Sequence, residues 1–168
     1  MNPNLTSLFF MLAAIAAFSI MAIPLRKNPG KIFAGILAGL LVGLINILVE
    51  FFGARNQIYF VHGLWMFAHS SMALTAAWIL FAACFALGTE SIKKLTMPQA
   101  ALMVYISVGI IIGTFSDFAG QSWLGHFQMG PNGNWLFIIP IWLILVPATV
   151  AIYGTVDKIF ARRPKGIS

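Results

Sequence analysis

The sequence predicts an all-α integral membrane protein, a bundle of five transmembrane helices with the N-terminus outside the cell and the C-terminus in the cytoplasm. Its residues are 60% hydrophobic and 8% charged, whereas a soluble domain carries about 25% charged residues. Five long apolar runs alternate with short polar connectors. Nine of the ten basic residues fall in the first connector, the third connector and the C-terminal tail: Arg26, Lys27, Lys31, Lys93, Lys94, Lys158, Arg162, Arg163 and Lys165. Because short loops rich in Lys and Arg stay cytoplasmic, this asymmetry sets the orientation, with Arg55 on the opposite side.

Each apolar run is close to the length of about 20 residues that a helix needs to cross the hydrocarbon core. We expect spans at about residues 5–23, 32–52, 61–87, 98–118 and 135–153. The third run, which starts between Tyr59 and His62, is long enough to tilt in the bilayer. Pro98 suits the first turn of the fourth helix. Residues 1–168 are therefore expected to form one multi-pass domain of the plasma (cell inner) membrane.

Composition argues against several other classes of protein. The isoelectric point is 9.9, but the basic residues flank helix ends, which indicates orientation and contact with anionic lipid rather than nucleic-acid binding. Cys84 is the one cysteine, so neither an intramolecular disulfide nor a cysteine metal cluster can form. The sequence has no phosphate-binding glycine loop, nucleophile elbow or Asp-rich prenyl-diphosphate motif, and it identifies no cofactor. The expected partner is the lipid bilayer.

Two stretches of the sequence resemble each other. Residues 50–53 (EFFG) precede residues 63–67 (GLWMF), and residues 117–120 (DFAG) precede residues 133–137 (GNWLF). Each unit starts with an acid at the outer end of one helix and ends at the start of the next helix. This pattern predicts a parallel repeat, in which the second and third helices are related to the fourth and fifth by rotation about the membrane normal. Chance is the alternative, because Gly, Phe and Trp are common at membrane interfaces.

Glycine stripes lead towards both acids of this repeat. Small residues recur every four positions in the second and fourth spans, at Gly35, Gly39, Gly43, Gly109 and Gly113. Such spacing lets helix backbones approach closely in lipid. The stripes predict either close packing inside the bundle or contact faces for a homo- or hetero-oligomer.

Ionisable residues at membrane depth are costly and usually face the interior of a bundle. Here they gather towards the outer side, at Glu50, His62, His69 and Asp117, with Arg55 nearby as a potential counter-ion. On a continuous helix the two histidines would share one face, about 10 Å apart along the axis. We therefore predict an outward-opening ligand pocket that contains Glu50, His69 and Asp117, with His62 at its mouth. Each residue has a plainer interpretation: a hydrogen-bonded core histidine for His69, and solvated interfacial groups for the others.

These residues raise the question of two kinds of chemistry, metal binding and acid–base catalysis. Two histidines seven positions apart cannot readily bind one ion, so His62 and His69 are only weak metal ligands and no metal is predicted. Glu50, His69 and Asp117 are the candidate catalytic residues for acid–base chemistry, because burial and neighbouring charges tune such groups.

Three functions are compatible with these features. The chain is expected to be either a subunit of a larger complex or a component that binds a small molecule or ion in a pocket open to the extracytoplasmic side. The alternative is an intramembrane enzyme that acts on a lipid or isoprenoid through carboxylate and histidine groups. Whether the chain is an enzyme stays open at this point.

Overall fold

The structure, a computed structural model, describes residues 2–161 and is mostly helical. The five long helices, in chain order, are α1 (Pro3–Ala22), α2 (Pro29–Arg55), α3 (Met72–Ile92), α4 (Pro98–Ala119) and α5 (Trp135–Ala161). Two short helical segments, η1 (Ile23–Leu25) and η2 (Gly120–Leu124), continue α1 and α4. All five helices are long and apolar enough to cross a membrane. The described residues therefore contain the expected number of helices that are long and apolar enough to span a membrane, and Pro98 lies in the first turn of its helix as expected.

The third helix starts later than predicted. We expected it near residue 61, but α3 begins at Met72, and the preceding residues form the strands β1 (Tyr59–Val61), β2 (Met66–Phe67) and β3 (Ser70–Ser71). The strands β2 and β3 pair as an antiparallel hairpin. Ala68 and His69 at its tip, and Trp65 just before β2, each have a positive φ of 48–68° that a right-handed helix does not allow. Ser71 then caps α3 through its Oγ, which accepts a hydrogen bond from Leu74 N at 3.4 Å.

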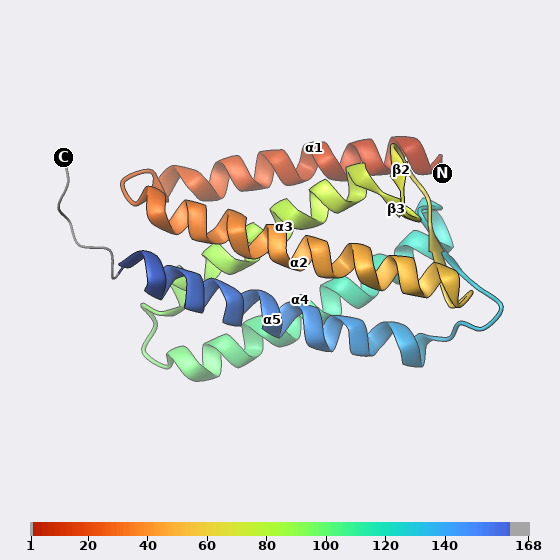
Figure 1. Ribbon diagram of the computed structural model, residues 1–168. Coiled ribbons are helices and arrows are strands. Elements are labelled where there is room, and N and C mark those ends of the chain that lie inside the picture. The colour runs from red at the N-terminus through yellow and green to blue at the C-terminus, as the bar shows by residue number, and fades with distance from the viewer. Residues whose placement is uncertain (1, 162–168) are drawn as a thin grey trace.

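The helices form a bundle with two distinct ends (Figure 1). The strand end carries the N-terminus and a second antiparallel pair, β1 with β4 (Phe127–Met129), in the register Tyr59↔Met129 and Val61↔Phe127. The tail end carries the α1–α2 and α3–α4 turns and the end of α5. Six of the nine clustered basic residues lie at the tail end, and Arg55 lies at the strand end; Arg162, Arg163 and Lys165 fall outside the described residues.

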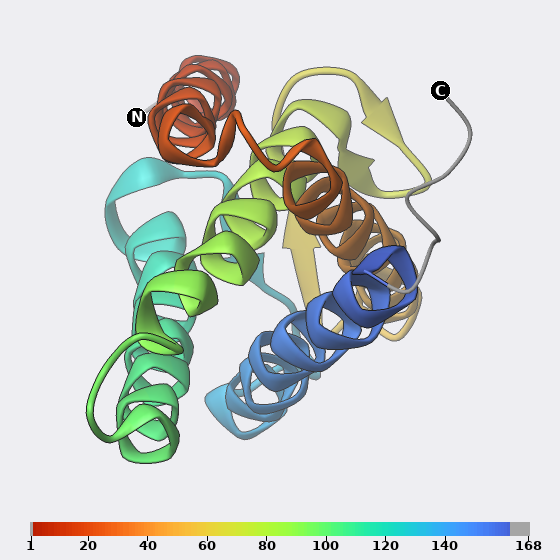
Figure 2. The ribbon, with the colours of Figure 1, turned by 90° about the vertical axis from the view of Figure 1, so that its left-hand side faces the viewer.

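The helix α3 is central and packs against each of the other four helices. The helices α1 and α4 lie on either side of it (Figure 2). The buried core has two separate parts. One, at the tail end, contains Ala38, Leu87 and Tyr153, and the other, at the strand end, contains Tyr59, Leu74 and Ile138. The residues between these two parts belong to neither part of the core and can line an internal space.

An ion-pair cluster ties three helices together at the tail end. The carboxylate of Glu90 in α3 accepts hydrogen bonds from Lys31 of α2 and from Lys93. The ammonium group of Lys93 also lies 3.7 Å from a carboxylate oxygen of Asp157 in α5. The acids of this cluster are thus paired with lysines, unlike the two acids towards the strand end.

The glycine stripes face neighbouring helices of the same chain. A Cβ atom added at Gly35 would meet the side chain of Leu87, and one at Gly39 or Gly43 would meet Ile79. In α4, Gly109 faces Phe85 and Val146, and Gly113 faces Trp142. Glycines in membrane helices let two helices approach closely. Here these close approaches are between helices of the same bundle.

Candidate functional site

The structure brings Glu50 and Asp117 together at one small cavity. Glu50 lies in the last two turns of α2, and Asp117 lies in the last turn of α4. Both side chains line a space of about 30 Å³, which we call the carboxyl chamber. Its remaining lining comes from the strand pair and from helices α2, α3 and α5: Asn46, Tyr59, Val61, Trp78, Phe127, Ile138, Ile141 and Trp142. A space of this size holds about one water molecule or one hydroxyl group.

Glu50 is held by one of its two carboxyl oxygens and leaves the other without a partner. The residue is only 6% exposed. Its Oε1 accepts a hydrogen bond of 2.7 Å from Asn46 Nδ2, one turn earlier in α2. Within the described part of the chain, Oε2 makes no hydrogen bond, and neither does the buried Ser70 Oγ, which lies near the same carboxyl. A buried polar atom without a partner is costly, so this oxygen calls for a donor, either the neighbouring Ser70 hydroxyl or a ligand.

Asp117 is oriented by a tryptophan from the facing helix. Its Oδ2 accepts a hydrogen bond of 2.7 Å from the indole Nε1 of Trp142 in α5. Trp142 also packs against Trp78 of α3, with ring centroids 5.2 Å apart. The two indoles thus form one wall between α3 and α5, and this wall fixes the position of the Asp117 carboxyl.

The strand pair covers the chamber at the strand end. Tyr59 of β1 and Phe127 of β4 stack with ring centroids 5.2 Å apart, and both rings line the chamber. Burial raises the pKa of the Tyr59 phenol, and the charges of Glu50 and Asp117 raise this pKa further. The phenol therefore stays protonated at neutral pH, which makes Tyr59 a neutral neighbour of both acids.

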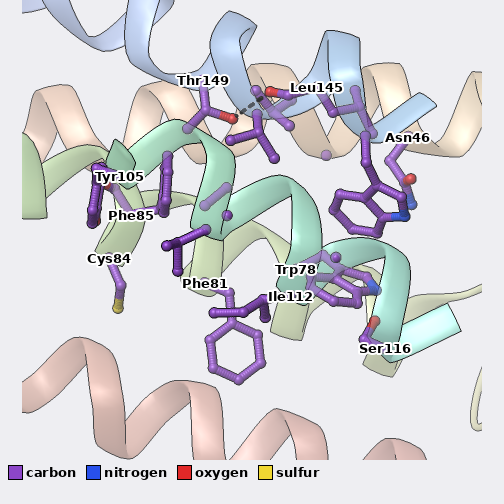
Figure 3. A pocket seen from close by; sticks show the side chains of 18 of the residues that line it. Asn46, Trp78, Phe81, Cys84, Phe85, Tyr105, Ile112, Ser116, Leu145 and Thr149 are labelled. Atoms are coloured by element: carbon purple, nitrogen blue, oxygen red, sulfur yellow. Dashed lines mark hydrogen bonds between the residues drawn. The ribbon is translucent and has the colours of Figure 1, made fainter. Parts of the chain in front are cut away.

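A much larger apolar space adjoins the chamber. We call it the lateral groove; it has a volume of about 470 Å³ and is lined by residues from all five helices (Figure 3). Asn46, Trp78 and Trp142 line both the groove and the chamber. Phe81 and Cys84 project from α3 into the space that separates α3 from α1 (Figure 3). The chamber that contains the two carboxyl groups therefore shares a wall with a large hydrophobic space.

The other predicted site residues lie elsewhere. His69 is exposed at the tip of the β2–β3 hairpin, beside the Phe51 ring at a centroid distance of 6.1 Å. His62 is also exposed, and its Nε2 lies 3.3 Å from Gln128 Oε1. Arg55 is exposed at the end of α2 and forms no ion pair within residues 2–161. The expectation that His69 shares a pocket with the two acids fails because its segment is a hairpin rather than a helix.

The histidine that is buried is His126, which lies between η2 and β4. It is 4% exposed, and its ring packs edge-on against Phe10 of α1. Burial lowers the pKa of this imidazole to about 4. Within residues 2–161, no three His, Cys, Asp or Glu side chains are grouped so that they could hold a metal ion.

Trp78 and Trp142 are site residues that sequence reasoning missed. A signal for them was available: each lies well inside an apolar run, whereas tryptophans of membrane proteins favour the interfaces, and a buried indole N–H needs an acceptor. The acceptor for Trp142 is one of the two unpaired acids.

No family model, no curated protein and no solved structure matches this chain. Its function must therefore be inferred from the chamber and the groove themselves.

Proposed function

We propose that the chain is a small-molecule-binding protein of the plasma (cell inner) membrane and that the carboxyl chamber is its binding site. One observation carries this proposal: two carboxyl groups from different helices line one buried space, and Glu50 Oε2 has no hydrogen-bond partner within the described residues. Intramembrane acids that have no basic partner are usually functional. By contrast, the described acids of the tail end are paired with lysines, which suits a structural role.

We propose a route of entry other than the outward opening that the sequence suggested. Tyr59, Val61 and Phe127 of the strand pair cover the chamber at the strand end, whereas the groove adjoins its other side. A ligand would therefore approach the acids from the bilayer rather than directly from the extracytoplasmic solution.

The test of this function is to recover a molecule that stays bound during purification. We expect solvent extracts of the full chain, purified in lipid nanodiscs, to contain one enriched compound. Glu50→Gln and Asp117→Asn should each lower its amount about tenfold or more, as expected when a hydrogen bond to a carboxylate is lost. Asp157→Asn, an acid-to-amide change at the tail end, is the matched control and should leave the amount unchanged. Equal amounts of the compound in all four proteins would refute the proposal.

The second candidate function is acid–base catalysis on a lipid or isoprenoid. The asymmetry of the two acids favours it: Asp117 accepts a hydrogen bond from Trp142, whereas one oxygen of Glu50 has no partner in the described chain. Carboxyl groups in unequal environments can divide the roles of acid and base. This catalytic function does not involve His69. It would be supported if the protein converted the recovered compound into a different product.

We further propose that the strand end is extracytoplasmic, so that the N-terminus is outside and the C-terminus is cytoplasmic. The asymmetry of the basic residues supports this orientation. In a Cys84→Ser background, we expect a membrane-impermeant maleimide added to intact cells to label Asn132→Cys at the strand end. Leu95→Cys, in the α3–α4 turn, should react only after the cells are opened. The reverse labelling pattern would contradict the orientation.

The parallel repeat is also a proposal, and the strand pairing supports part of it. A two-fold rotation about the centre of the β1–β4 pair would exchange Tyr59 with Phe127, and Glu50 and Asp117, the acids that begin the two matching stretches, line the same chamber. The second half of the sequence match has no such support, since residues 63–67 lead into a hairpin whereas residues 133–137 start α5. An oligomer stays a prediction, and because the stripe glycines are covered within the chain, it would use other faces.

A further inference from the structure

We propose that the lateral groove binds the hydrocarbon chain of a single-chain lipid alcohol, whose hydroxyl group lies in the carboxyl chamber. This inference rests on the proposed function, because it names the class of molecule that the chamber would bind. Three features support it in turn: the opening of the groove, its lining and the size of the chamber.

The groove opens at membrane depth. Val108 and Ile112 of α4 both line it and are 45% and 60% exposed, so its wall continues onto the outer surface of the bundle. On a helix that crosses a membrane, this surface faces lipid chains. The groove volume of about 470 Å³ also falls in the range of about 300–1,000 Å³ typical of ligand sites. A molecule dissolved in the bilayer can therefore enter from the side.

The lining of the groove suits a hydrocarbon chain. It contains no charged residue in the described chain, and six aromatic rings contribute to it: Phe10, Trp78, Phe81, Phe85, Tyr105 and Trp142. Two of its hydroxyl groups already donate to backbone carbonyls, Tyr105 Oη to Phe85 O at 2.9 Å and Thr149 Oγ1 to Leu145 O at 2.8 Å. Most of the groove thus offers a ligand only apolar contacts.

Unpartnered polar atoms gather towards one end of this apolar space. Ser116 Oγ, one residue before Asp117, is buried and makes no hydrogen bond within residues 2–161, and the same holds for Glu50 Oε2. Glu50 is itself 94% buried, since only 6% of it is exposed. A hydroxyl group in the chamber could donate to the carboxyl oxygen, whereas Ser116 Oγ lines the groove.

The size and charge of the chamber also limit which head groups a bound lipid can have. Its volume of about 30 Å³ admits a hydroxyl group but not a phosphate. Among the described residues, two carboxyl groups and no basic side chain line it, so an anionic head group would be repelled. Phospholipids, prenyl diphosphates and fatty acids are therefore poor ligands, and an uncharged alcohol is a good one.

The single cysteine provides a specific probe. Cys84 lines the groove and is half-buried, and the chain has no other thiol. We would measure the rate at which N-ethylmaleimide modifies Cys84 in the purified full chain in nanodiscs, with added geranylgeraniol, hexadecan-1-ol, geranylgeranyl diphosphate or palmitic acid. Saturating geranylgeraniol should slow the reaction at least tenfold, and the two anionic compounds should not slow it. Retention of tritiated geranylgeraniol by the chain gives a second measurement that does not depend on the thiol.

Two tryptophan variants test the groove itself. Ile112→Trp should fill the groove and lower geranylgeraniol retention at least tenfold. Ile111→Trp is the matched control, because Ile111 is the adjacent residue, is 66% exposed and lies outside the groove lining; it should leave retention unchanged. Glu50→Gln should weaken retention roughly tenfold to a hundredfold through the lost hydrogen bond.

The results separate this inference from the proposed function. Protection by both alcohols supports a general lipid alcohol, and protection by geranylgeraniol alone supports an isoprenoid alcohol. Protection by palmitic acid or the diphosphate, or equal effects of the two tryptophan variants, would overturn the inference. If neither alcohol binds while the carboxyl variants still lose a co-purified compound, the proposed function stands and the inference is wrong. If the carboxyl variants also retain their compound, both are wrong.

Discussion

Replacing Gly39 with alanine is expected to destabilise the bundle by about 1–3 kcal/mol, the usual cost of overpacking a tightly packed interior. The added Cβ would overlap the backbone carbonyl oxygen of Ile79 and would lie 3.2 Å from the backbone nitrogen of Ala83. A backbone atom cannot rotate away as a side chain can, so α2 and α3 would have to move apart. Because α3 packs against all the other long helices, this movement would disturb the whole bundle.

The matched control is the same substitution at Gly154 in α5, where a new Cβ would meet nothing within 4 Å. We expect Gly154→Ala to leave stability unchanged or to raise it by up to about 1 kcal/mol, because alanine favours a helix more than glycine does. Unfolding of the two purified variants in the same detergent, followed by circular dichroism, measures the difference. Similar stabilities for Gly39→Ala and Gly154→Ala would show that the α2–α3 contact is looser than described.

The number and positions of the helices were largely predictable because hydrophobic length is a strong signal in a membrane protein. Four of the five helices begin within a few residues of their expected starts. The third does not, because residues 59–71 are apolar enough to resemble a helix although they form strands. Ser70 and Ser71, directly before the apolar run of α3, were the local sign of a helix start.

Only part of the candidate site was predictable. The cost of a carboxyl group in lipid drew attention to Glu50 and Asp117, and both line one chamber, whereas their role as a site stays a prediction. The predicted role of His69 depended on helical periodicity, and that periodicity does not exist in a hairpin. The groove could not have been predicted, since it arises from the way α1 and α4 lie on either side of α3, and this arrangement has no local signature in the sequence.

The largest effect on binding is expected when Glu50→Gln and Asp117→Asn are combined. Loss of the hydrogen bond to the Glu50 carboxylate, together with loss of the second carboxylate at the chamber, should lower ligand retention about a hundredfold or more. We expect the unfolding temperature of the same double variant to stay unchanged or to rise. Asn46 and Trp142 could still donate hydrogen bonds to the amide oxygens, and an amide is less costly than a carboxylate in an apolar space.

This combination of effects distinguishes a binding site from a structural contact. Residues retained for function often lower stability, and their replacement then stabilises the fold. The matched comparison is Glu90→Gln, which removes the acid that pairs with Lys31 and Lys93 and should lower the unfolding temperature without lowering ligand retention. A double variant that unfolds earlier than the Glu90→Gln protein, with ligand loss in proportion, would indicate that Glu50 and Asp117 hold the bundle together rather than bind a molecule.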